Sequence, residues 1–132
     1  MVLVIMYKNS RLGLEQSIEL AGFQLNPVSW VARSDLFVLS SDYEGFGNVL
    51  VEALATGITI VSTKCNFGPP EIINYGEYGY LAEVGDETDL TNKILYALDN
   101  PLPKEKQISR AKEFHVDLIM QQYTNLFASL TT

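Results

Sequence analysis

The stretch that decides the fold runs from Ser40 to Gly57 and reads SSDYEGFGNVLVEALATG. It follows an apolar run, contains Gly45 and Gly47, and continues as a helix-forming segment that Gly57 is expected to end. Glycine lets the backbone turn tightly and approach a ligand, and the free N–H groups at the start of a helix attract anions. The stretch therefore predicts a strand, a loop suited to an anion such as a diphosphate, and a helix.

Outward from this stretch, short apolar runs bounded by turn residues indicate strands. The five candidate strands are Val2–Met6, Ser17–Leu20, Asp35–Ser40, Ile58–Ser62 and Tyr80–Val84. The candidate helices are Pro27–Arg33, Gly47–Thr56, Pro70–Asn74, Glu87–Asp99 and Val116–Leu130, and Lys104–Lys112 is expected to be a solvated helix or a loop. Strands that alternate with helices predict an α/β fold, a Rossmann-like parallel sheet with helices on both faces.

The run Leu36–Leu39 lacks polar alternation, which is typical of a central parallel strand covered on both faces. Right-handed crossovers bring the loops that follow parallel strands to one edge of the sheet, where ligands bind. The loops after Ser40 and after Ser62 are therefore the expected ligand site.

The composition favours a single domain and disfavours a nucleic-acid-binding protein. The 132 residues are enough for one domain, and 16 acidic against 9 basic residues give a net charge of -7, which disfavours nucleic acid as a partner. The single cysteine, Cys65, excludes an internal disulfide and is interpreted as inert. The sequence shows no signal peptide and no apolar run long enough for a bilayer, so a cytoplasmic location is expected.

Two carboxylates flank the glycine loop, with seven residues between them. Glu52 is the only charged residue from Val49 to Ala55, so it either lies on an exposed stripe of the helix or binds a hydroxyl-rich ligand. Glu44 alone reads as a solvated loop carboxylate. A separation of about 10 Å from the helical rise would suit two points along one long ligand, and it does not by itself indicate an acid and base pair.

The segment from Glu44 to Gly57 resembles the signature of retaining GT-B glycosyltransferases, in which two glutamates flank seven residues that include Phe-Gly. The similarity covers about half the chain in consistent order. It includes Gly22-Phe23, Ser34–Val38, Ile60–Thr63, Gly68–Ile73, Gly79–Leu81 and Gly85-Asp86. The resemblance implies transfer of a hexosyl unit from a nucleotide diphosphate sugar to an acceptor hydroxyl with retention, without a metal or other cofactor.

The resemblance also implies a role for each matching residue. Glu44 would be the catalytic residue that meets the hydroxyls of the transferred sugar. The amides of Phe46, Gly47 and Asn48 would bind the sugar and diphosphate of the donor. Glu52 would bind the ribose hydroxyls. The wall beside the nucleotide would be formed by Gly68, Pro69 and Glu71. For Glu71, a role in stabilising the helix dipole is an equal alternative.

The chain departs from this family at its beginning. Members carry an Arg and a Lys that hold the donor diphosphate, and neither Lys8 nor Arg11 matches them. We therefore expect residues 1–132 to be a single donor-binding domain that lacks its first strand and the N-terminal acceptor lobe. The chain alone is expected to bind a nucleoside diphosphate weakly and to transfer no sugar.

The apolar stripe of the closing helix, from Ile119 to Leu130, has little chain left to bury it. Two further hypotheses follow. The chain could be a non-catalytic nucleotide-sugar-binding module, or an interaction module whose stripe docks on a separately encoded acceptor lobe. By analogy with relatives that build cell-surface polysaccharides, the inner face of the cell membrane is a further expected location, reached through the missing lobe.

Overall fold

The computed structural model describes residues 12–130. Three strands alternate with helices along the chain. The elements are α2 (Pro27–Val31), β1 (Phe37–Leu39), α3 (Asn48–Thr56), β2 (Ile60–Thr63), α4 (Pro69–Ile72), the 3-10 turn η1 (Asn74–Gly76), β3 (Tyr80–Ala82), α5 (Glu87–Asp99), α6 (Lys104–Lys112) and α7 (Val116–Leu130).

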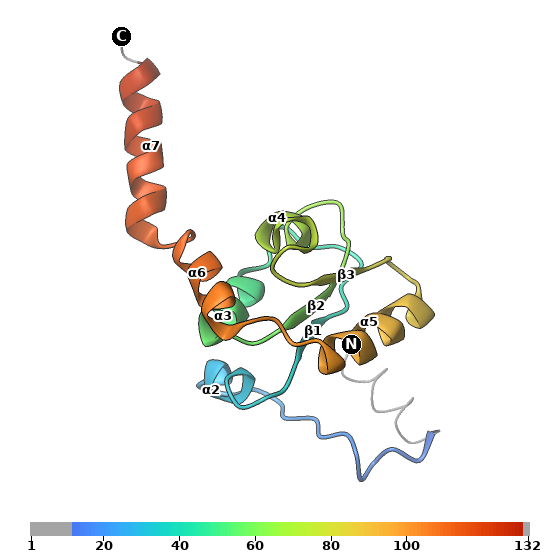
Figure 1. Ribbon diagram of the computed structural model, residues 1–132. Coiled ribbons are helices and arrows are strands. Elements are labelled where there is room, and N and C mark those ends of the chain that lie inside the picture. Colours follow the sequence, from blue (N-terminus) through green and yellow to red (C-terminus); the bar gives the residue numbers. More distant parts are fainter. Residues whose placement is uncertain (1–11, 131–132) are drawn as a thin grey trace.

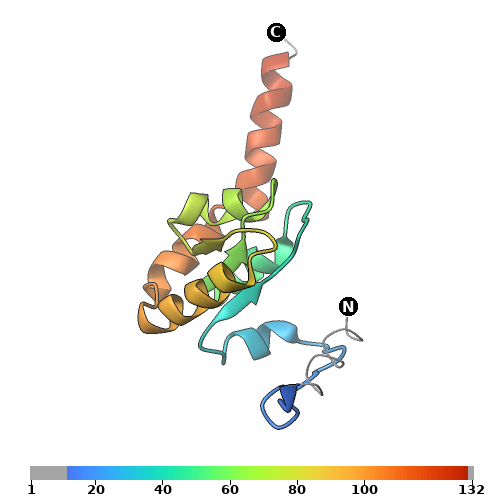
Figure 2. The same ribbon diagram turned by 90° about the vertical axis from the view of Figure 1, so that its right-hand side faces the viewer.

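The three strands form one parallel sheet in the order β1-β2-β3. Phe37 lies opposite Ile60, and Val61 lies opposite Tyr80. Helix α3 lies on one side of the sheet and α5 on the other (Figure 1), and the view turned by 90° shows the same layers (Figure 2). The predicted fold class, a parallel α/β sheet flanked by helices, is confirmed.

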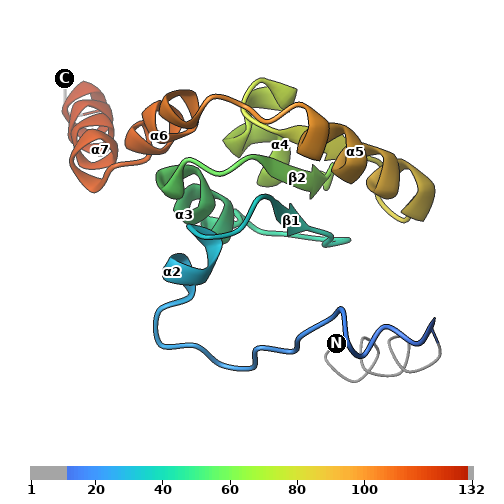
Figure 3. The same ribbon diagram turned by 60° about the horizontal axis from the view of Figure 1, so that its bottom comes forward.

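Two predictions about strands differ from the structure. Ser17–Leu20 is a turn followed by irregular, exposed chain, because this segment lies apart from the sheet and pairs with no strand among residues 12–130 (Figure 3). The prediction of a central strand at Leu36–Leu39 is wrong within the described sheet, where β1 is an edge strand and Val38 is 38% exposed. The central strand is β2, all of whose residues are buried. Val2–Met6 lies outside the described residues.

Helix α3 begins and ends where its glycines permit. Gly47 precedes it with φ 88°, and Gly57 follows it with φ 82°, where its amide donates to the carbonyl of Leu54. Both angles lie in the left-handed region that favours glycine. Leu50, Leu54 and Ala53 are buried and form the core together with residues of β2 and the chain around α4.

Helix α6 packs along α3, which corrects the expectation of a solvated helix or loop. Its Gln107 is fully buried, and a side chain at Gly57 would collide with Lys104 at the start of α6. Beyond α6, helix α7 projects away from the sheet (Figure 1). Five apolar side chains of the predicted stripe are exposed: Met120, Tyr123, Leu126, Phe127 and Leu130. Ile119, the first residue of that stripe, is half-buried. Among the described residues, no helix has the length and apolarity to cross a bilayer.

The buried side chain of Gln107 yields a stability prediction. Neither its amide nitrogen nor its amide oxygen has a hydrogen-bond partner among the described residues, and a buried unpaired polar group destabilises the folded state. Gln107→Met keeps a similar volume without the polar atoms, so we expect the free energy of unfolding in urea to rise by about 1–2 kcal/mol. The exposed Gln121, changed in the same way, should alter it by less than about 0.5 kcal/mol. A destabilised Gln107→Met variant would contradict this prediction.

Candidate functional site

The two loops predicted to bind a ligand are in direct contact at the carboxyl edge of the sheet. The loop of residues 40–47 follows β1, and the loop of residues 64–68 follows β2. A Cβ atom added at Gly68 would lie 2.4 Å from the carbonyl oxygen of Phe46 and 3.0 Å from that of Gly45. Only glycine permits this approach, so Gly68 brings the second loop against the first.

The N-terminus of α3 opens beside this contact. Gly47 has no side chain to cap the helix, and no other side chain does so among the described residues. The amides of Asn48 and the next residues therefore keep their capacity to donate to a ligand, and the helix dipole adds partial positive charge. Asn48 is exposed and Phe46 is 45% exposed, so the predicted amide-bearing segment is accessible.

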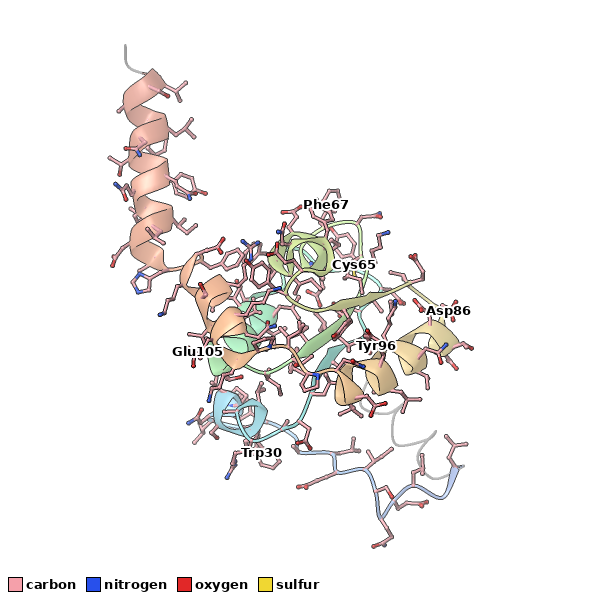
Figure 4. All side chains as sticks on the ribbon, viewed as in Figure 1. Trp30, Cys65, Phe67, Asp86, Tyr96 and Glu105 are labelled. Atoms are coloured by element: carbon pink, nitrogen blue, oxygen red, sulfur yellow. The ribbon has the colours of Figure 1, made fainter. Side chains whose placement is uncertain are left out.

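Glu44 is half-buried and has a defined partner in the same loop. The hydroxyl of Ser41 donates to Oε1 of Glu44 at 2.7 Å. The carbonyl oxygen of Ser41 in turn accepts hydrogen bonds from the hydroxyl of Thr63 and, at 3.0 Å, from the thiol of Cys65. Cys65 therefore helps to hold the loop in place, and its burial agrees with the interpretation of this cysteine as inert. It lies with Phe67 at one end of the sheet, far from Trp30 (Figure 4).

Glu52 lies on the exposed side of α3, opposite the buried face formed by Leu50, Ala53 and Leu54. It has no ion pair or hydrogen bond through its carboxylate with any other described residue. Exposure is compatible with both interpretations that the sequence left open, and among the described residues no hydrogen bond links Glu52 to the loop of Glu44. Its role as a ribose ligand stays a prediction.

Gly68 and Pro69 are buried, whereas the side chain of Glu71 is exposed in the first turn of α4. The end of this short helix is held by Arg110 of α6, whose Nη2 donates to the carbonyl of Glu71 at 2.7 Å and whose Nε donates to that of Ile72 at 2.8 Å. The guanidinium thus holds the end of α4 through its main chain and leaves the carboxylate of Glu71 exposed.

Arg110 also links the two loops through aromatic side chains. Its guanidinium lies 4.8 Å from the ring centre of Phe114, and that ring meets Phe46 edge-on at 5.8 Å between centres. The ring of Tyr78 lies 5.3 Å from the guanidinium carbon. Desolvation, together with the negative charges of Glu77 and Glu113, raises the pKa of Tyr78, so this phenol is neutral at physiological pH.

The surroundings of the site are rich in carboxylates. A cavity of about 300 Å³ at the carboxyl edge is lined by residues that include Asp42, Glu83 and Asp86. Nearby Lys64 lies 3.9 Å from Glu83 in an exposed ion pair. A diphosphate would be repelled by this cavity, so the uncapped end of α3 is the favourable place for it. Within residues 12–130, no three His, Cys, Asp or Glu side chains gather as a metal site.

A larger hollow of about 640 Å³ lies between α6 and α7 and contains none of the predicted site residues. It arises because α7 projects from the end of α6, and polar side chains such as Gln121 and Asn125 line it. The loop contact and the helix end, rather than this hollow, define the candidate site.

Sequence reasoning missed four residues that organise the site: Ser41, Thr63, Cys65 and Arg110. The first belongs to the quoted loop, where only its spacing of three residues from Glu44 hinted at a hydrogen bond. The other three act over long sequence separations, which no local pattern reveals.

The contact at Gly68 can be tested by substitution. An L-residue is strained at φ 83°, and its Cβ would also collide with the backbone of residues 45 and 46. Gly76→Ala is the matched control, because Gly76 has φ 105° but open space around its Cβ position. We expect Gly68→Ala to lower the free energy of unfolding by about 2 kcal/mol more than the control does. Equal losses for the two variants in urea titrations would show that the loops do not depend on this contact.

The chain was compared with known proteins and structures. The family model described as glycosyl transferases group 1 matches residues 6–114. The chain is 35% identical over 121 residues to N-acetyl-alpha-D-glucosaminyl L-malate synthase of Bacillus anthracis, covering 88% of the chain and 32% of that protein. It is also 35% identical over 107 residues to N-acetylgalactosamine-N,N'-diacetylbacillosaminyl-diphospho-undecaprenol 4-alpha-N-acetylgalactosaminyltransferase of Campylobacter jejuni, covering 78% of the chain and 29% of that protein.

A solved structure gives the same result at the level of the fold. The crystal structure of Anabaena Alr3699/HepE in complex with UDP superposes with a TM-score of 0.83 at 29% identity, covering 97% of this chain and 36% of that one. The chain thus spans about a third of the length of the relatives it matches. On the family match and this shared fold, the chain belongs to the glycosyl transferases group 1 family and has the Rossmann-like fold of GT-B glycosyltransferases.

Proposed function

We propose that the chain is the donor-binding domain of a glycosyltransferase that moves a hexosyl unit from a nucleotide diphosphate sugar to an acceptor hydroxyl with retention. The observation that carries this proposal is the contact of the two carboxyl-edge loops beside the uncapped N-terminus of α3. Backbone amides at a helix end suit a diphosphate, and carboxylates on either side suit the hydroxyls of a sugar and a ribose.

The ligand in the Anabaena structure supports a nucleoside diphosphate as part of the donor, because that similar structure was solved with UDP. Relatives named for N-acetylhexosamine transfer support a six-carbon sugar unit in the same place. The family match covers the segments that carry Glu44, Glu52 and Glu71.

In the proposed reaction, the bond between the anomeric carbon and the diphosphate oxygen breaks, and a bond from that carbon to the acceptor oxygen forms. The bonding electrons leave with the nucleoside diphosphate, and the proton of the acceptor hydroxyl passes to the departing diphosphate. Glu44 would bind sugar hydroxyls and stabilise positive charge at the anomeric carbon, while the amides of Phe46, Gly47 and Asn48 would hold the sugar and diphosphate. Glu52 would accept from the ribose hydroxyls, and Gly68, Pro69 and Glu71 would form the wall beside the nucleotide.

A second candidate, an interaction module, is favoured by α7. Its apolar stripe is exposed, and its single charged residue is Asp117 at the first turn. An acceptor-binding lobe seated on this stripe would bury it and complete the enzyme, whether it comes from the same polypeptide or from another. An interaction role for α7 is compatible with the donor role. A wholly non-catalytic module, by contrast, would bind the nucleotide but would transfer no sugar even when an acceptor-binding lobe is present.

Replacing Glu52 distinguishes a ligand-binding role for this carboxylate from a purely structural role on α3. Glu52→Gln keeps the shape of the side chain but weakens charge-assisted hydrogen bonds, so we expect the binding free energy of UDP to weaken by about 1–3 kcal/mol. The melting temperature should hardly fall, because Glu52 has no partner among the described residues.

Calorimetric titration and thermal unfolding of the same Glu52→Gln sample make the comparison. The matched control is Glu105→Gln, another exposed helical glutamate on α6, which should leave the affinity for UDP unchanged. Because Glu105 lies in the first turn of α6, its replacement should lower stability slightly through the helix dipole. Unchanged UDP affinity together with a clear loss of stability would make Glu52 a scaffold residue.

Diphosphate binding by the chain as it stands should be weak. The described cations near the site are engaged, since Arg110 holds α4 and Lys64 pairs with Glu83. We expect a dissociation constant for UDP no better than about 0.1 mM, equivalent to roughly -5.5 kcal/mol, and no sugar transfer from UDP-glucose by the 132-residue chain. Turnover of UDP-glucose by the purified chain, measured as released UDP, would refute this expectation.

A further inference from the structure

We propose that Ser41 is a positioning residue that orients the carboxylate of Glu44 toward the donor sugar, and that Thr63 and Cys65 hold Ser41 for this task. The inference rests on the proposed function, because it assumes that Glu44 meets the sugar.

The first step is the contact between Ser41 and Glu44. The hydroxyl of Ser41 donates to one carboxylate oxygen at 2.7 Å, and both side chains are partly buried. A carboxylate has two oxygens with several acceptor sites, so this bond restricts the rotation of Glu44 and still leaves acceptor capacity for a ligand.

The second step is the anchoring of Ser41 itself. A serine in a glycine-bearing loop could rotate with the loop, and its bond to Glu44 would then define no direction. The carbonyl of Ser41 accepts from both Thr63 and Cys65, which lie 22 and 24 residues further along the chain. Both lone pairs of this carbonyl are therefore used, and the loop cannot turn away without losing two bonds.

The third step is the rigidity of the anchor. Thr63 is the last residue of the central strand β2 and is 4% exposed, and Cys65 is 2% exposed. The sulfur of Cys65 also lies 3.6 Å from the hydroxyl oxygen of Thr63. Buried groups at the end of a central strand are well ordered by packing. Through their hydrogen bonds to Ser41 they restrict the position of Ser41, and Ser41 restricts the carboxylate of Glu44.

A purely local role for Ser41 would be to stabilise a turn through a bond across three residues. That role predicts the same effect on every ligand of the site. A positioning role predicts an effect only on ligands that carry the transferable hexosyl unit, because Glu44 would touch that unit and not the nucleoside diphosphate. The pair of probes UDP and UDP-glucose separates the two roles, with UDP-N-acetylglucosamine and GDP-mannose extending the panel to other sugars and another base.

The experiment measures dissociation constants of the 132-residue chain for these probes by titration of amide resonances in NMR spectra. Ser41→Ala removes the donor to Glu44, and Thr63→Val and Cys65→Ala each remove one anchor. The conservative variants Ser41→Thr and Cys65→Ser keep a hydroxyl donor at each position. Ser34→Ala is the matched control, since the Ser34 hydroxyl donates to the carbonyl of Trp30 on α2, away from the site.

We expect Ser41→Ala to weaken binding of the nucleotide sugar about threefold to tenfold relative to the nucleoside diphosphate, equivalent to up to about 1.4 kcal/mol. Thr63→Val and Cys65→Ala should change the ratio in the same direction, and the conservative variants should restore it. The ratio for Ser34→Ala should equal that of the unmodified chain.

Two outcomes would overturn the proposal, and they differ. If both probes bind and their ratio is the same in Ser41→Ala, or both affinities fall equally with the melting temperature, Ser41 is a local structural residue and the donor site stands. If no nucleotide or nucleotide sugar of the panel binds to the unmodified chain, the proposed function fails and the positioning role fails with it.

Discussion

Gly68 packs against the carbonyl oxygen of Phe46, and this backbone contact sets the distance between the two loops that follow β1 and β2. No side chain could occupy the space, so the approach is made by main chain alone. The contact places α4 beside the start of α3, where a Cβ atom at Gly47 would lie 3.7 Å from the side chain of Ile72. The arrangement of the rest of the site depends on it.

Helix α6 supports this contact from outside the sheet. Arg110 holds the carbonyls at the end of α4, and its guanidinium stacks on Phe114, whose ring meets Phe46 of the other loop. An Arg side chain at 16% exposure with all these partners loses little entropy per bond, because its planar fork is pre-organised. The two loops are thus tied twice, once through main chain and once through an arginine and two phenylalanines.

The sequence predicted the parts of this structure that depend on local chemistry. Helix α3 begins after Gly47 and ends before Gly57, as expected, and the parallel sheet with flanking helices is confirmed. Contacts between distant segments could not be predicted, since nothing near Cys65 indicates that its thiol reaches Ser41, and nothing near Gln107 indicates that its side chain is buried. The edge position of β1 could not be predicted for the same reason, because the neighbours of a strand depend on the whole sheet. The ligand contacts of the predicted site residues stay predictions.

The charges around the candidate site are unfavourable to an anionic donor. A net charge of -7 and the acidic cavity beside the sheet oppose an anionic donor, and helix-end amides offer only partial charges against it. A group-transfer site nevertheless needs positive charge where the diphosphate leaves. Among the described residues, Arg110 holds α4 and Lys64 pairs with Glu83, so the proposed donor role calls for further cations. Under the proposed donor role, residues 12–130 supply shape and hydrogen bonds, and the positive charge comes from outside this range.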